Sequence, residues 1–139
     1  MSTNPRKNSE GYSDPTAFYA LRNILNPKTP TPAPRKKVYI CSPYRGRNET
    51  EIGENVGRAI KYCQYAVKQG VFPIAPHLYL TRFLDDSDPA ERKLGLELGL
   101  VMLRDCSELW VFGERVSEGM RGEINEATKL GIKIINAQI

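Results

Sequence analysis

A carboxylate close to a predicted helix start is the feature of this sequence with the clearest chemical potential. The apolar residues 109–112 end at Gly113, and after a polar loop a helix opens at Ser117 and carries Glu123 in its second turn. Backbone N–H groups at a helix start attract anions, and the serine hydroxyl adds another hydrogen-bonding group. A carboxylate near such a site could attack an electron-poor carbon of a phosphate-bearing or sugar-bearing ligand. The alternative is a solvated glutamate that the helix dipole alone favours.

A second polar segment follows the apolar residues 37–41 and contains Ser42, Tyr44, Arg45 and Gly46. A guanidinium is a planar fork suited to phosphate or carboxylate, and glycine lets the backbone approach a ligand closely. Surface loops often contain such residues, so this segment indicates a binding site only if the fold places it where ligands bind.

Two other motifs give weaker evidence of function. His77 is the only histidine, and we expect it to line a pocket rather than to act in catalysis. The acidic run 85–88 precedes Pro89 and is typical of a helix start, with Asp88 as the cap. Three cysteines at unrelated spacings indicate buried apolar residues, and neither a metal nor another cofactor is expected.

The composition indicates one folded domain preceded by a basic arm. The chain has 139 residues, of which 40% are apolar and 26% charged, and no apolar run approaches the ~18 residues of a membrane helix. Residues 1–37 hold seven Lys/Arg against two Asp/Glu, whereas residues 38–139 hold thirteen against fourteen. The net charge of +4 therefore lies in the arm, which could touch nucleic acid but is more often a solvated tail. Without a secretory signal, the expected location is the cytoplasm.

Strand and helix patterns alternate beyond the arm. Residues 1–34 are expected to be a flexible, proline-rich arm with a short helix at 14–25, and residues 35–139 to be the folded domain. Apolar periodicity predicts strands at 37–41, 71–75, 109–112 and 132–135, and helices at 49–69, 88–104 and 117–130.

This alternation predicts a doubly wound, flavodoxin-like or Rossmann-like α/β fold, with a parallel sheet of four to five strands and flanking helices. The simplest strand order, 2-1-3-4, places the topological switch point between the first and third strands. Ligands bind there, beyond the carboxyl ends of the strands. The loops 42–47 and 113–123 follow those two strands, so we expect them to form the site.

Three segments in this order resemble the nucleoside 2-deoxyribosyltransferase-like superfamily: VYICSPYRG, PIAPHLY and LWVFG…SEGMRGEINEA. Within it the chain is most similar to a family of small bacterial and phage proteins, and it is related to 2′-deoxynucleoside 5′-monophosphate N-glycosidases. The resemblance covers residues 37–136. It implies a nucleotide or nucleoside substrate, and a homodimer in which a neighbouring subunit completes the active site.

The resemblance also implies roles for matching residues. Glu123 matches the catalytic glutamate, and Tyr39 matches an active-site tyrosine. Ser117 matches a phosphate-binding serine six residues before that glutamate. The implied substrate and phosphate site comprises Ser42, Tyr44, Arg45, Gly46, His77, Ser117, Gly119 and Met120.

One family residue is missing. The related enzymes carry an aspartate eight residues before the acidic residue that opens the third strand, and here that position is Leu100. The implied function is N-glycosidic hydrolysis or deoxyribosyl transfer with Glu123 as nucleophile. The alternatives are a non-catalytic nucleotide-binding or sensing module, an NAD-directed glycohydrolase, and an interaction protein whose arm binds nucleic acid or another partner.

Overall fold

The structure of the protein is a computed structural model that describes residues 32–139. Within it, residues 35–139 form one compact unit. The short helix expected at 14–25, and most of the predicted arm, lie outside the described residues. No helix of the described part is long and apolar enough to cross a membrane.

Strands and helices alternate along the compact unit, as the periodicity predicted. Each long helix begins at a side-chain cap: Asn48 for α2, Asp88 for α4 and Ser117 for α5. In chain order the elements are β1 Lys37–Cys41, α2 Glu49–Lys68, β2 Phe72–Ile74, α3 Pro76–Tyr79, the 3-10 helix η1 Leu80–Arg82, α4 Pro89–Arg104, β3 Glu108–Val111, α5 Glu118–Lys129 and β4 Lys133–Asn136.

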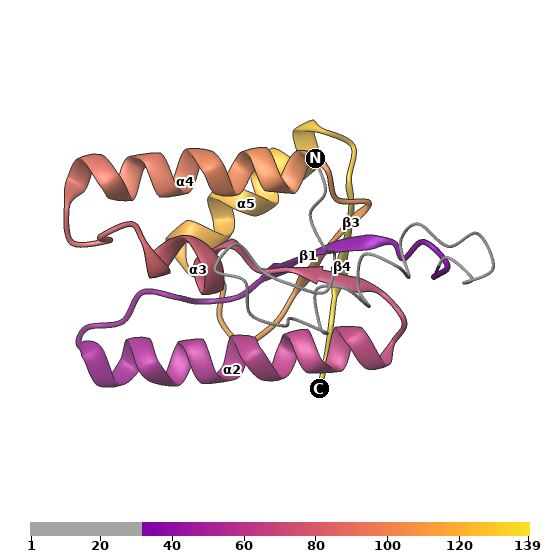
Figure 1. Cartoon of the computed structure of the whole chain (residues 1–139), viewed down its shortest axis with the longest axis horizontal. Coiled ribbons are helices and arrows are strands. Elements are labelled where there is room, and N and C mark those ends of the chain that lie inside the picture. The colour runs from indigo at the N-terminus through magenta and orange to yellow at the C-terminus, as the bar shows by residue number, and fades with distance from the viewer. Residues whose placement is uncertain (1–31) are drawn as a thin grey trace, which may run out of the picture. The chain divides into compact units, whose positions relative to one another are not determined.

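The four strands form one parallel sheet in the order β2-β1-β3-β4. This confirms the doubly wound α/β fold and the strand order 2-1-3-4. In Figure 1, α2 covers one face of the sheet, while α4 and α5 cover the other. The switch point therefore lies beyond the carboxyl ends of β1 and β3.

Alternation along β1 and β3 divides the core between these two faces. Val38, Ile40, Trp110 and Phe112 pack towards α2, where the Tyr62 ring stacks on Phe112 with centroids 4.4 Å apart. The residues between them pack towards α4 and α5: Tyr39, Cys41, Leu109 and Val111. Tyr39 and Cys41 thus share a face because they are two residues apart on one strand.

The strand expected at 71–75 is present, although β2 spans only Phe72–Ile74. The prediction missed α3 and η1, which follow this strand. Pro76 stands at the first position of α3, where its fixed φ suits a helix and its missing N–H costs nothing. Elements of three or four residues are too short to show a periodicity.

Candidate functional site

Glu123 lies on the side of α5 that faces the sheet. Met120 and Ala127 are buried, Ile124 packs on the same core, and Glu123 shares their helical spacing of three and four residues. The carboxylate is therefore partly buried between α5 and β1. The spacing Met120, Glu123, Ile124, Ala127 in the sequence places Glu123 beside the buried face of α5, and the partial burial of its side chain favours this over a fully solvated glutamate.

Two side chains of β1 meet this carboxylate. The Cys41 Sγ lies 3.9 Å from Glu123 Oε1 and 3.8 Å from the Met120 carbonyl oxygen. The Tyr39 side chain, only 3% exposed, lies close enough to the same carboxylate for each group to shift the pKa of the other. The structure thus brings the two expected catalytic residues together. Cys41 was expected only as a small buried hydrophobe, although its place two residues after Tyr39 indicated the same face.

Burial changes the protonation of this group of residues. Desolvation raises the pKa of Glu123 to about 7, although the hydrogen bonds from Tyr39 and Cys41 oppose the shift. Burial and the nearby carboxylate raise the pKa of Tyr39 and of Cys41 well above their usual ranges, so both stay protonated and can donate. With a pKa of about 7, Glu123 is only partly ionised at neutral pH.

The position at which the related enzymes carry an aspartate lies among packed residues near Tyr39. A Cβ on Gly99 of α4 would lie 3.6 Å from the Tyr39 hydroxyl oxygen and 3.7 Å from Pro76 Cβ, so α3 and α4 approach Tyr39 here. The next residue, Leu100, is partly buried and packs on the cluster that contains Tyr39 and Cys41. An apolar side chain therefore occupies the position at which the resemblance calls for an acid.

Two buried polar atoms at the carboxyl edge of the sheet lack a hydrogen-bond partner within residues 32–139. They are Ser42 Oγ, directly after β1, and His77 Nε2, in α3 after β2. Burial lowers the pKa of His77 to about 4, so the imidazole is neutral at physiological pH, and the Tyr44 ring lies beside it with centroids 5.6 Å apart. Because buried polar groups are normally hydrogen-bonded, these two unsatisfied atoms mark this edge of the sheet as a candidate ligand site.

Asn55 holds the loop after β1, a role that no pattern in the sequence indicated. This buried residue of α2 donates from Nδ2 to the carbonyl oxygens of Tyr44 and Arg45, at 3.0 and 3.2 Å. The Arg45 side chain, thus anchored at its backbone, pairs with Asp86 at 3.4 Å.

The loops after β1 and β3 meet, as the switch-point argument predicted. Gly113 has φ = 95°, which favours glycine, and a Cβ there would lie 3.7 Å from Pro43 Cδ. The start of α5 follows this contact.

The three candidate residues at the α5 start have different surroundings. Ser117 Oγ accepts from the Met120 backbone N–H at 3.3 Å, while the Ser117 N–H faces Met120 Sδ at 3.4 Å. Met120 is buried, and Gly119 is exposed with open space around it. Ser117 therefore caps its own helix, and no hydrogen bond among residues 32–139 connects it with Arg45.

Gly46 was expected to let the backbone approach a ligand. In the structure, Gly46 lies close to the start of α2. A Cβ on Gly46 would lie 2.4 Å from Glu51 Cβ and 3.0 Å from the Ile52 nitrogen, at the start of α2. Neither atom belongs to the far end of a flexible side chain, so the loop itself would have to move.

Gly46→Ala is accordingly expected to lower the free energy of unfolding by roughly 1–3 kcal/mol, the usual cost of overpacking. Gly53→Ala, at an open position within α2, is the matched control and is expected to stabilise by about 0.5–1 kcal/mol. Urea denaturation of both variants measures the difference. Equal stabilities would show that the 42–47 loop is not held against α2.

Within residues 32–139, no group of three or more His, Cys, Asp or Glu side chains is arranged to hold a metal ion. The arrangement of the site instead combines a partly buried carboxylate, two protonated donors and two unsatisfied polar atoms at one sheet edge.

The fold of the chain is similar to that of a protein of known structure. The chain is similar in structure to a 2-deoxyribosyltransferase from the bacterium Bacillus psychrosaccharolyticus, with a TM-score of 0.52 and 16% sequence identity over 74% of this chain and 75% of that chain. It therefore has a distant nucleoside deoxyribosyltransferase-like fold. A comparison with curated proteins gives no match. Residues 36–137 match the model of the family described as "Domain of unknown function (DUF7768)", and the chain belongs to this family.

Proposed function

We propose that this protein cleaves the N-glycosidic bond of a 2′-deoxynucleoside 5′-monophosphate, by hydrolysis or by transfer of the deoxyribosyl group to a second base. The observation that carries the proposal is the partly buried Glu123 carboxylate, which interacts with Tyr39 and Cys41 beside the switch point. The likeness in fold to a deoxyribosyltransferase supports the same chemistry.

In this reaction the ionised Glu123 carboxylate forms a bond to C1′ while the C1′–N bond breaks. The base leaves with the electron pair and takes a proton from water or from a second acidic group. Water, losing a proton, or a second base then attacks C1′ and frees the carboxylate. Because Tyr39 and Cys41 stay protonated, they hold the carboxylate in place by donating to it.

The binding residues divide between two parts of the ligand. Ser42 and His77 supply the unsatisfied polar atoms that would border the sugar and base, with the Tyr44 ring beside them. Arg45 and the α5 start at Ser117 and Gly119 would hold the 5′-phosphate, through a guanidinium and through backbone N–H groups.

Leu100 favours a second function, a nucleotide-binding module without catalysis. An apolar residue packed on the Tyr39 cluster supplies no proton for the departing base. This function uses the same binding residues, and only a search for released base separates it from the enzyme.

To distinguish the enzyme from the binding module, the full chain is incubated with deoxynucleosides, their 5′-monophosphates and NAD, and free base is measured by chromatography. We expect base from at least one monophosphate, about tenfold faster at pH 8 than at pH 6, because the nucleophile must be ionised and the pKa of Glu123 is about 7. Release from NAD alone would instead indicate a glycohydrolase acting on that dinucleotide. Nucleotide binding without any release of base would establish the non-catalytic module.

A further inference from the structure

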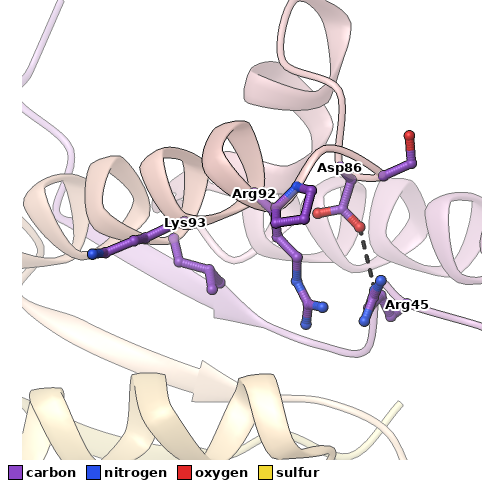
Figure 2. A pocket seen from close by; sticks show the side chains of 7 residues that line it. Arg45, Asp86, Arg92 and Lys93 are labelled. Carbon is purple, nitrogen blue, oxygen red and sulfur yellow. Dashed lines mark ion pairs between the residues drawn. The ribbon is translucent and has the colours of Figure 1, made fainter.

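A cluster of cations lies beside the proposed phosphate site, where α4 begins. Arg45, Arg92 and Lys93 line one depression of about 330 Å³, and Asp86 is the only carboxylate among its lining residues. Figure 2 shows the Arg45 and Arg92 side chains extending to the same side, with Asp86 paired to Arg45 and Lys93 directed away from them. The volume is at the small end of the roughly 300–1,000 Å³ typical of ligand pockets.

The charges of this depression are poorly compensated by the protein. Within residues 32–139, neither Arg92 nor Lys93 has a carboxylate within ion-pair distance, and only Arg45 is paired. The Arg45–Asp86 distance of 3.4 Å is longer than a charge-assisted hydrogen bond, and the two side chains are 57% and 34% exposed. Such a pair contributes little to stability, so Arg45 is free to turn towards an anion.

The neighbouring acids do not enter the depression. Asp85 accepts from the Ser87 N–H and hydroxyl, and Asp88 accepts from the Ala90 N–H as the cap of α4. The first N–H groups of α4 are therefore partly used, and the attraction for an anion comes from the side chains of Arg45, Arg92 and Lys93.

Arg45 also lines a second depression of about 370 Å³, whose lining includes the carboxylates Asp85 and Asp86 as well as Tyr44 and Thr81. Arg45, Asp86 and Ser87 are common to both depressions, so the two adjoin at the arginine. The second depression is the more acidic of the two, so an anion at Arg45 is better placed in the first. Two guanidinium groups, of Arg45 and Arg92, share that first depression. This matches two linked phosphate groups better than one.

We propose that Arg45, Arg92 and Lys93 bind a pyrophosphate group, which extends the ligand class from a monophosphate to a nucleoside di- or triphosphate or a dinucleotide. The inference rests on the proposed function for the nucleoside part of the ligand only. One phosphate would lie at Arg45 and the other at Arg92, with Asp86 released from Arg45 and the Lys93 side chain turned towards the ligand from its outward direction in Figure 2.

The test is isothermal titration calorimetry of the full chain with pyrophosphate and with inorganic phosphate, at one fixed ionic strength because salt screens such contacts. Pyrophosphate is expected to bind at least tenfold more tightly than phosphate, and Arg92→Ala to remove this advantage. Asp86→Asn is expected to raise pyrophosphate affinity several-fold, because it removes the carboxylate that pairs with Arg45. Arg104→Ala, at the far end of α4, is the matched control and is expected to keep the wild-type preference.

Deoxyadenosine diphosphate and NAD then distinguish the two sources of a pyrophosphate group. Equal affinities for phosphate and pyrophosphate in the wild type, or an unchanged preference in Arg92→Ala, would overturn the inference. So would a fall in pyrophosphate affinity in Asp86→Asn. These binding results are independent of base release: a chain that binds pyrophosphate through Arg92 but releases no base supports the pocket and contradicts the enzyme.

Discussion

Glu123→Gln is expected to lower base release from a deoxynucleoside monophosphate by on the order of a thousandfold or more, with little change in nucleotide affinity. Glutamine keeps the size of the side chain and can still accept from Tyr39 and Cys41, but it provides neither the charge nor the nucleophilic oxygen. Single-turnover assays at pH 8 measure the chemical step, and calorimetry measures affinity.

The matched control for this loss is Glu118→Gln. Glu118 is exposed in the first turn of the same helix, so its substitution removes the same charge from α5 while it keeps the backbone N–H groups that are proposed to hold the phosphate. Its base release is expected to stay within about twofold of the wild type, as for surface changes in general. If Glu118→Gln and Glu123→Gln behave alike, the carboxylate of Glu123 is not the nucleophile.

Glu123→Gln is also expected to stabilise the folded protein at alkaline pH, by up to about 3 kcal/mol at pH 9 relative to its effect at pH 5. The pKa of Glu123 is about 7 in the folded chain, against an ordinary value near 4.5. The folded state therefore holds the proton more tightly than the unfolded state. Stability from this group is complete below about pH 4.5 and is lost as pH rises through about 7.

Urea denaturation of wild type and Glu123→Gln at pH 5, 7 and 9 measures this dependence. The stability difference between the two proteins is expected to grow from pH 5 to pH 9, because only the wild type must then bury a charge. Glu118→Gln again controls for the loss of an acidic residue from α5. A difference that stays constant with pH would show that the Glu123 carboxylate is solvated in the folded chain.

Base release and pH-dependent stability of Glu123→Gln together distinguish a functional role of this carboxylate from a purely structural one. Glutamine would fill the same space without burying a charge, so the Glu123 carboxylate costs stability as pH rises through its pKa of about 7. Loss of base release with a gain in alkaline stability is the pattern expected of a functional residue. A gain in stability alone fits the nucleotide-binding module.

The sequence by itself determined the order of strands and long helices, and with it the switch point. Apolar periodicity reports which face of each element is buried, and short right-handed connections then leave one simple order for the sheet. That order placed the loops after β1 and β3 side by side, and the contact between Gly113 and Pro43 confirms it.

The tertiary structure decided what the site residues contact and how they ionise. A pKa depends on burial and on groups brought from distant segments. The pKa of Glu123 is raised by its burial, while Tyr39 and Cys41 of β1, both more than eighty residues away in the sequence, oppose the rise. The pairing of Arg45 with Asp86 and the hydrogen bonds from Asn55 of α2 to the loop after β1 likewise join separate segments. The sequence pattern predicted which loops lie side by side, but neither residue type nor spacing specifies which side chains meet there.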